Sequence, residues 1–201
     1  MAKRIRDPRS RQHLVETTRR LVAARGAAAT TMRAVAAEAG VTTGSVTHYF
    51  DDKAELMTAV LRHNGEVVAQ RVVDSVGNRR GLDAVRRAVH GLLPVDEQQL
   101  TCWQVWLAFW SHAPEERDGG FSDGYEVWRA LLKQHLAEAV EDGDLPAGLD
   151  LPHEVRVLGA LVVGTGLLAG SDPAARRRLR RRARRVFNEH FERLARSSGA
   201  E

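Results

Sequence analysis

"AEAGVTTGSVTHYF", residues 37–50, briefly interrupts a chain whose apolar residues otherwise follow helical spacing. The helix before the break has one apolar stripe: Met32, Val35, Ala36 and Ala39. Thr31 is well placed to cap the start of that helix. Gly40 is predicted to end it, because glycine readily adopts the left-handed conformation found at helix termini. A second short helix follows with Thr42 at its cap, so the stretch predicts a helix-turn-helix unit.

The two sides of this second helix differ in chemistry. At about 100° per residue, its apolar side carries Val46, Tyr49 and Phe50. The opposite side carries short or polar residues: Gly44, Ser45, Thr47 and His48. Such a surface suits the major groove of DNA, where small polar side chains meet base edges. An ordinary capped surface helix looks similar in isolation, but the preceding helix and the spacing favour DNA.

Charge is distributed unevenly along the chain. Residues 1–53 contain ten lysines and arginines against five acidic residues, whereas the remainder has a net charge of −1. Lys53 follows Asp51-Asp52 in the first turn of a helix, where a cation opposes the helix dipole, and Glu55 is spaced for a capping box with Asp52. A phosphate partner would explain this lysine. The basic N-terminal end therefore favours a polyanionic partner.

Helical periodicity continues through the rest of the chain. An N-terminal helix is expected to stop at Gly26, and Pro and Gly clusters separate the later helices. The expected later helices are 53–76, 82–93, 97–112, 121–141, 152–170 and 173–196. With the three N-terminal helices, this gives an all-α fold of about nine helices.

Composition restricts the class of protein. The longest apolar stretch, Val157–Gly170, is shorter than the roughly 20 residues of a membrane span, and no secretory signal is recognisable. Cys102 is the only cysteine, so an intrachain disulfide is excluded. Cys102 could be a redox sensor, although a small buried hydrophobic residue is the commoner role. We expect a cytoplasmic protein that does not enter membranes.

Residues 9–56, and above all "TTMRAVAAEAGVTTGSVTHYFDDKAEL", resemble the DNA-binding domain of the TetR family of transcriptional regulators. The resemblance implies a domain at 1–53 whose three helices bind DNA. It also implies a domain at 54–201 that binds a small effector and forms a homodimer. Carried over by position, the expected DNA-binding residues are Arg33, Thr42, Thr43, Gly44, Ser45, Thr47, His48, Tyr49 and Lys53. The family often has tyrosine where this chain has Thr47.

A second resemblance lies in "WQVWLAFW", residues 103–110, which is similar to the branch containing the choline-responsive repressor of glycine betaine synthesis. Aromatic cages bind quaternary ammonium groups by cation–π attraction. The expected ligand-binding residues are Trp103, Trp106, Trp110, Tyr125 and Trp128. A stripe of tryptophans at helical spacing is also typical of a plain core.

This branch commonly has an Asp-Gly-Leu-Trp run in its penultimate helix, whereas this chain has Val163-Gly164-Thr165-Gly166. The departure removes an acid and an aromatic ring, and it favours an effector larger and more apolar than choline.

An enzyme is the main rival interpretation. Gly164, Gly166 and Gly170 superficially resemble a dinucleotide-binding loop, but their last spacing is wrong and no strand pattern surrounds them. A helix packed closely against a neighbour explains these glycines better. The histidines and Cys102 form no defensible catalytic or metal-binding set. We expect no enzymatic activity, no catalytic residue, no metal and no cofactor.

Eight arginines occupy the ten positions Arg176–Arg185. They predict a solvated basic face, or alternatively a second nucleic-acid surface. Apolar residues of the last two helices, among them Leu161 and Phe187, predict a four-helix dimer interface. The chain as a whole is interpreted as a ligand-responsive repressor that binds a palindromic double-stranded operator as a homodimer. An activator, or a DNA-binding protein of this fold without a ligand, is the alternative.

Overall fold

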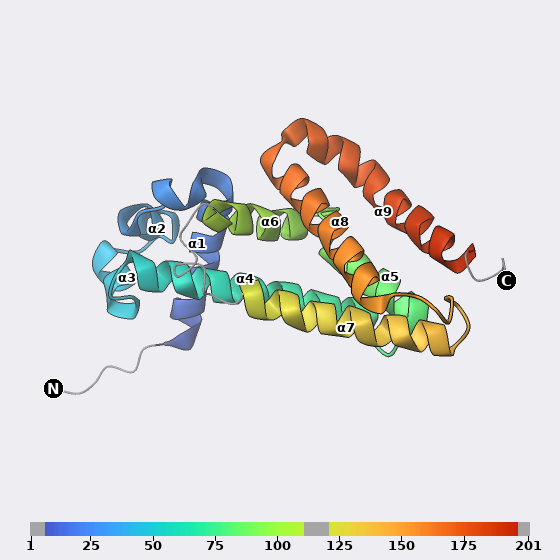
Figure 1. Cartoon of the computed structure of the whole chain (residues 1–201). Helices are drawn as coiled ribbons and strands as arrows, with labels where there is room; N and C mark the ends of the chain where they lie inside the picture. Colours follow the sequence, from blue (N-terminus) through green and yellow to red (C-terminus); the bar gives the residue numbers. More distant parts are fainter. Residues whose placement is uncertain (1–6, 111–120, 197–201) are drawn as a thin grey trace. The chain divides into compact units, whose positions relative to one another are not determined.

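The structure is a computed structural model that describes residues 7–110 and 121–196, without the side chains of residues 110, 121–123, 180 and 181. These residues form nine helices and no strand, so the all-α prediction is confirmed (Figure 1). The helices are α1 (Pro8–Ala29), α2 (Met32–Glu38), α3 (Thr43–Tyr49), α4 (Lys53–Val76), α5 (Gly81–Leu92), α6 (Glu97–Trp110), α7 (Phe121–Glu141), α8 (Leu151–Ser171) and α9 (Pro173–Arg196).

The chain divides into two compact units. The first comprises Met1–Glu66 with Gln104–Phe121, and the second comprises Val67–Trp103 with Ser122–Glu201. The boundary between the two units therefore falls inside α4, between Glu66 and Val67, although this helix begins at Lys53. The functional boundary after residue 53 is a different division and stays a prediction.

The first unit has its own apolar core. Val46 and Phe50 at the end of α3 are fully buried with Val35 of α2, and Val22 of α1 is 1% exposed. Val105 of α6 belongs to the same cluster. Gly26 interrupts the first helix, as the sequence predicted, because its φ of 79° and ψ of 163° are not helical. A further helical turn follows it, so α1 as a whole extends to Ala29.

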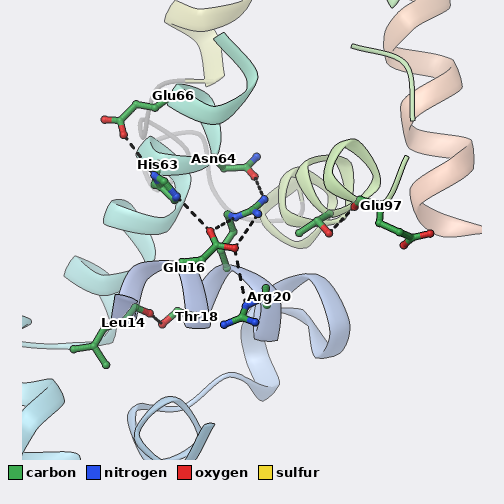
Figure 2. A network of polar contacts seen from close by, with 10 residues as sticks. Leu14, Glu16, Thr18, Arg20, His63, Asn64, Glu66 and Glu97 are labelled. Atoms are coloured by element: carbon green, nitrogen blue, oxygen red, sulfur yellow. Dashed lines mark hydrogen bonds and ion pairs between the residues drawn. The ribbon is translucent and has the colours of Figure 1, made fainter. Parts of the chain in front are cut away.

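A polar network joins α1 to α4 inside the first unit, and Figure 2 shows Glu16 facing His63 and lying near Asn64. Arg19, which is 5% exposed, donates from Nε to Glu16 at 2.8 Å and from a terminal nitrogen to Asn64 at 3.4 Å. Burial alone would raise the pKa of Glu16, but hydrogen bonds and charges from Arg19 and His63 bring that pKa below its usual value. The network neutralises a guanidinium that would otherwise be buried alone.

In the second unit, a carboxylate from α7 caps the start of α5. Glu138 accepts a hydrogen bond from the Gly81 backbone N–H at 3.0 Å and one from Gln134 Nε2 at 3.1 Å, and it lies 2.7 Å from His135 Nδ1. The Gly81 N–H, followed by His135 and Gln134, lowers the pKa of Glu138 to about 2. Because the first N–H groups of a helix lack partners within it, this contact fixes where α5 begins against α7.

The carbonyl groups at the end of α5 are bound by side chains of α6. Gln99 donates from Nε2 to the Gly91 oxygen, and Trp103 donates from Nε1 to the Leu92 oxygen at 2.8 Å. Trp103 is 2% exposed. A side chain at Gly166 of α8 would overlap the Trp103 indole ring, so this glycine is required for the packing of α6 on α8.

The glycines of "GALVVGTGLLAG", residues 159–170, lie within the helix α8 and not in a loop after a strand. This placement removes the structural context that a dinucleotide-binding loop needs. Gly159 faces the hydroxyl group of Tyr125 in α7, where a side chain would overlap it. Close packing of neighbouring helices therefore accounts for Gly166, as the sequence predicted, and also for Gly159. It does not account for Gly164, where no heavy atom lies within 4 Å of an added Cβ.

By length and composition alone α8, at 21 residues, could cross a bilayer, although the sequence predicted too short an apolar stretch. The helix is longer than expected because Asp150 caps it by accepting from the His153 N–H at 2.9 Å. α8 packs against α9 and α5, and it buries Glu154, whose carboxylate lies 3.1 Å from His190 of α9. These contacts are those of a core helix.

Candidate nucleic-acid interface

The turn between α2 and α3 is built by Gly40. Its φ is +68°, the left-handed region, as the sequence predicted. The Val41 N–H binds the Ala36 oxygen at 2.9 Å and the Gly40 N–H points to the Ala37 oxygen at 3.3 Å. This pair of bonds is a Schellman motif, which satisfies the last carbonyl groups of a helix. The chain can therefore leave α2 after Glu38 and begin α3 at Thr43, with only four residues between the two helices.

Thr42 caps α3, as expected. Its side-chain oxygen accepts from the Ser45 N–H at 3.1 Å and lies 3.0 Å from the Ser45 hydroxyl group. Thr31 caps α2 in the same way, accepting from the Ala34 N–H at 3.1 Å. Each of these caps satisfies an N–H group that has no partner inside its helix. Both short helices therefore begin at defined residues.

The division of α3 into two faces follows the expected pattern. Val46 and Phe50 are 0% exposed, and Tyr49 packs partly buried against the same core. Arg11 of α1 lies over the Phe50 ring at 4.8 Å, a contact that no local sequence signal predicted. The outward residues are exposed: Thr42, Thr43, Gly44, Thr47 and His48. Ser45 is half-buried beside its cap.

Gly44 lies in the first turn of α3, where the fold does not require a glycine. A Cβ atom there would meet only the Thr42 side-chain oxygen at 3.7 Å, an ordinary contact. Its helical backbone does not require glycine either, because only Gly26, Gly40, Gly77, Gly81 and Gly143 have positive φ among the described residues. A methyl group at Gly44 would therefore fit the protein itself, so packing does not explain a glycine at this position.

Lys53 has a structural contact that the sequence did not reveal. Its ammonium group donates to the Ala27 oxygen at 2.8 Å and lies 3.4 Å from the Ala28 oxygen, at the end of α1. An ammonium group has three donors, so these carbonyl groups leave capacity for a phosphate oxygen. Arg33 of α2 is exposed. Both cations thus belong to the unit that presents α3.

The capping box before α4 is formed with a shift of one residue. Asp52 accepts from the Glu55 N–H at 2.8 Å, as expected from the spacing. Glu55 reaches back to the Asp51 N–H at 2.7 Å and not to that of the cap residue. The box fixes the start of α4 directly behind α3.

The predicted aromatic residues lie in different surroundings. Trp106 packs against the core of the first unit. Trp103, Tyr125 and Trp128 belong to the second unit, where Tyr125 and Trp128 stack with their centroids 5.9 Å apart. The side chain of Trp110 lies outside the described residues. A five-residue ligand site therefore stays a prediction.

Two features distinguish the aromatic residues of the second unit. Arg129 already lies over the Tyr125 ring at 5.8 Å, so the chain itself supplies a cation to that ring. Trp128 is 5% exposed, and its Nε1–H has no acceptor in the described part of the chain. A buried donor without an acceptor is uncommon in folded proteins. Sequence reasoning could place this indole near a ligand but could not reveal its unpaired N–H.

Metal-binding side chains do not converge within the described residues, where no three of His, Cys, Asp and Glu are grouped so as to hold an ion. The arginines of α9 are partly engaged: Arg176 donates to the Ala169 oxygen at 3.2 Å, and Arg185 lies 2.6 Å from Glu189. Arg178 lies 4.0 Å from Asp172. The side chains of Arg180 and Arg181 are outside the described residues.

Comparisons with known proteins match both parts of the chain. Residues 14–60 match the family described as bacterial regulatory proteins, tetR family. Residues 81–196 match the C-terminal domain of BetI-type transcriptional repressors. The transcriptional regulator PksA of Bacillus subtilis is 28% identical over 193 residues, which cover 96% of this chain and 93% of PksA.

Further matches are similar in kind. The transcriptional regulator BetI of Stenotrophomonas maltophilia is 34% identical over 122 residues, which cover 57% of this chain and 61% of that BetI. A transcriptional regulator from Saccharomonospora viridis, solved in complex with choline, has a TM-score of 0.80 at 23% identity. That comparison covers 92% of this chain and 97% of the solved one, and it shows a common fold.

Proposed function

This chain belongs to the tetR family of bacterial regulatory proteins, with a BetI-type C-terminal domain, and we propose that it acts as a homodimer that represses genes from a palindromic operator. It is a ligand-responsive transcriptional regulator, and its relatives are regulators of transcription. Effector binding would lower operator affinity by coupling two sites on one molecule. Its place of action would be the cytoplasm, where bacterial operators are accessible.

The outward face of α3 is the observation that carries this proposal. It combines exposed Thr42, Thr43, Thr47 and His48 with a fully buried apolar side, so the helix is fixed while its polar groups stay available. Short hydroxyl and imidazole groups can donate to and accept from base edges in the major groove. Gly44 supports the same conclusion, because the fold does not need a glycine there. Tyr49 and Lys53 would contact phosphates from the flanks.

Selection of bound duplexes from random DNA tests this function directly. The expected result is an enriched inverted repeat, bound with affinity that falls steeply as salt concentration rises. The variants Thr47→Ala and His48→Ala should then lower the ratio of operator to random-duplex affinity by roughly tenfold each.

Lys53→Ala is the matched comparison, because a phosphate contact carries no sequence information. It should weaken binding to operator and random duplexes alike. Its contacts with the Ala27 and Ala28 oxygens require that folding be checked by melting temperature. If the two α3 variants lowered affinity for all duplexes equally, α3 would not be the helix that recognises the base sequence.

For the effector we propose a site that includes Trp128 in the second unit. Its unpaired Nε1–H calls for an acceptor, and its stacking with Tyr125 offers apolar surface. The choline bound to the structural relative makes quaternary ammonium compounds the first chemistry to test. The choline hydroxyl group could accept from Trp128, while a longer alkyl chain would fit the more apolar effector expected from the sequence.

Intrinsic tryptophan fluorescence, read with choline and with alkyltrimethylammonium ions, tests this site. A true effector should change the fluorescence and release the operator. Trp128→Phe should weaken that ligand by roughly tenfold through loss of one hydrogen bond. The same change removes an unsatisfied donor but also some buried apolar volume, and because the two effects oppose each other the melting temperature of the free protein should change little. A drop in stability with an unchanged ligand response would identify Trp128 as core.

A further inference from the structure

Two nitrogen atoms on α5 are buried without hydrogen-bond partners. They are Nε of Arg86 and Nε2 of His90, each shielded from solvent within a half-exposed residue. Residues four apart on a helix share a face, so the two side chains are neighbours. Leaving a buried donor unpaired costs free energy, and for a charged group the cost is larger. Two such atoms on one turn therefore indicate a missing partner.

Arginines surround this part of the second unit. The Arg86 guanidinium lies over the Phe191 ring of α9 at 5.7 Å, and α5 and α9 are in contact. Burial, followed by the charges of Arg184, Arg87 and Arg86, lowers the pKa of His90. His90 lies in the last turn of α5, where the helix dipole would favour the cation and raise the pKa. The lowered pKa therefore means that burial and the nearby arginines outweigh the dipole.

The carboxylates found in ion pairs on these helices are directed elsewhere. Asp83 pairs with Arg79 at 3.0 Å and lies 3.7 Å from Arg87. Glu189 pairs with Arg185. Neither Arg86 nor Arg184 has an ion pair with a carboxylate in the described part of the chain. The carboxylate of Glu154 on α8, which packs against both helices, lies 3.1 Å from His190. Arg86 and Arg184 are therefore cations without a paired carboxylate among the described residues.

We propose that Arg86 and His90 of α5, with Arg184 of α9, form a binding site for the oxyanion of a small molecule, either a carboxylate or a phosphate group. The Arg86 Nε–H donates to one oxygen. The neutral His90 ring, with its proton on Nε2, donates to the same group. Packing on Phe191 holds the guanidinium in place, which lowers the entropy lost on binding. The site concerns anions, so it is distinct from the quaternary ammonium site proposed around Trp128.

Calorimetric titration of the full chain, in a buffer free of oxyanions, tests the proposal with inorganic phosphate and with citrate as separate arms. Saturable binding of one anion per chain is expected in at least one arm, and the arm that binds identifies the chemistry. Arg86→Gln and Arg184→Gln should each weaken binding by roughly tenfold, the value of one charge-assisted hydrogen bond. The control Arg182→Gln removes an exposed arginine of the same helix and should change affinity by less than about twofold.

A second measurement uses the unmodified protein, in case a variant does not fold. The imidazole ¹⁵N signal of His90, assigned by its loss in His90→Gln, should move along the same saturation curve as the heat. Three results would overturn the site: no saturable binding in either arm, an equal loss in the Arg182 control, or an unmoved His90 signal. The last two would indicate an adventitious ion only, attracted by the net positive charge of the chain.

Discussion

At the scale of single residues, Gly166 and Trp103 show how the lack of a side chain fixes a packing contact. The indole ring of Trp103 fills the space in which a Gly166 side chain would lie, and its N–H caps α5. In this chain α8 therefore has no side chain at position 166, and the Trp103 ring of α6 occupies that space.

Gly166→Ala should therefore destabilise the protein although alanine favours helices. Replacing glycine by alanine inside a helix would by itself stabilise the protein by about 1 kcal/mol. Overpacking against a buried indole costs typically 1–3 kcal/mol, so we expect a net loss of about 1 kcal/mol in the free energy of unfolding. Urea denaturation measures it.

Gly164→Ala is the matched control on the same helix, since no heavy atom lies within 4 Å of the added Cβ. It should stabilise the protein by about 0.5–1 kcal/mol. Equal effects of the two substitutions would show that Trp103 does not occupy the space beside Gly166.

Local sequence predicted the residues whose roles depend on near neighbours. Thr31, Thr42 and Gly40 were identified as caps and turn because their partners lie within four residues. The contact of Lys53 with the end of α1 depends on residues 25 and 26 positions away. The unpaired Trp128 N–H likewise results from folding, because spacing along the chain cannot reveal which donor lacks a partner.

At the scale of helices, periodicity predicted both ends of α4, the end of α7 and the start of α9 as observed, and the ends of α5 and α8 to within one residue. The predicted end of the sixth helix at residue 112 lies outside the described residues. Gly26 interrupts helical geometry as predicted, and a further turn that the sequence did not predict follows it. The apolar residues predicted to form the dimer face divide between interior and surface. Phe187 is 0% exposed and belongs to the interior of the protomer, so it is not available for contact between two copies.

Leu168 of α8 and Val186 of α9 belong to the same predicted dimer face and are exposed, at 56% and 46%, so they are the candidates for contact between copies. Light scattering should give about twice 22.2 kDa for the unmodified chain. Leu168→Glu with Val186→Glu should yield folded monomers that bind the operator more weakly, because a charge disfavours burial in an interface. Val127→Glu on α7, at 70% exposed, is the control and should stay dimeric. Monomers from the unmodified chain would refute this assembly.

At the scale of the whole molecule, α3, proposed to read DNA, belongs to the first unit, and Trp128, proposed to contact the effector, belongs to the second. One α4 helix runs continuously from the first unit into the second, so the two functions share a helix. The excess of positive charge in residues 1–53 predicted that the N-terminal end binds DNA. The match of residues 14–60 to the tetR family agrees with this prediction. The effector could not be predicted in the same way, because a ligand site depends on which buried groups stay unpaired after packing.

The most direct test of the central claim is a hydroxyl-radical footprint of the unmodified protein on its selected operator. A homodimer with one α3 per protomer should protect two symmetric half-sites with centres roughly 34 Å apart, one turn of the double helix, or a whole multiple of that distance. Adding the effector should abolish both protected regions together. Protection of a single site, or even protection along random DNA, would contradict the proposal that this chain is a dimeric, sequence-reading repressor.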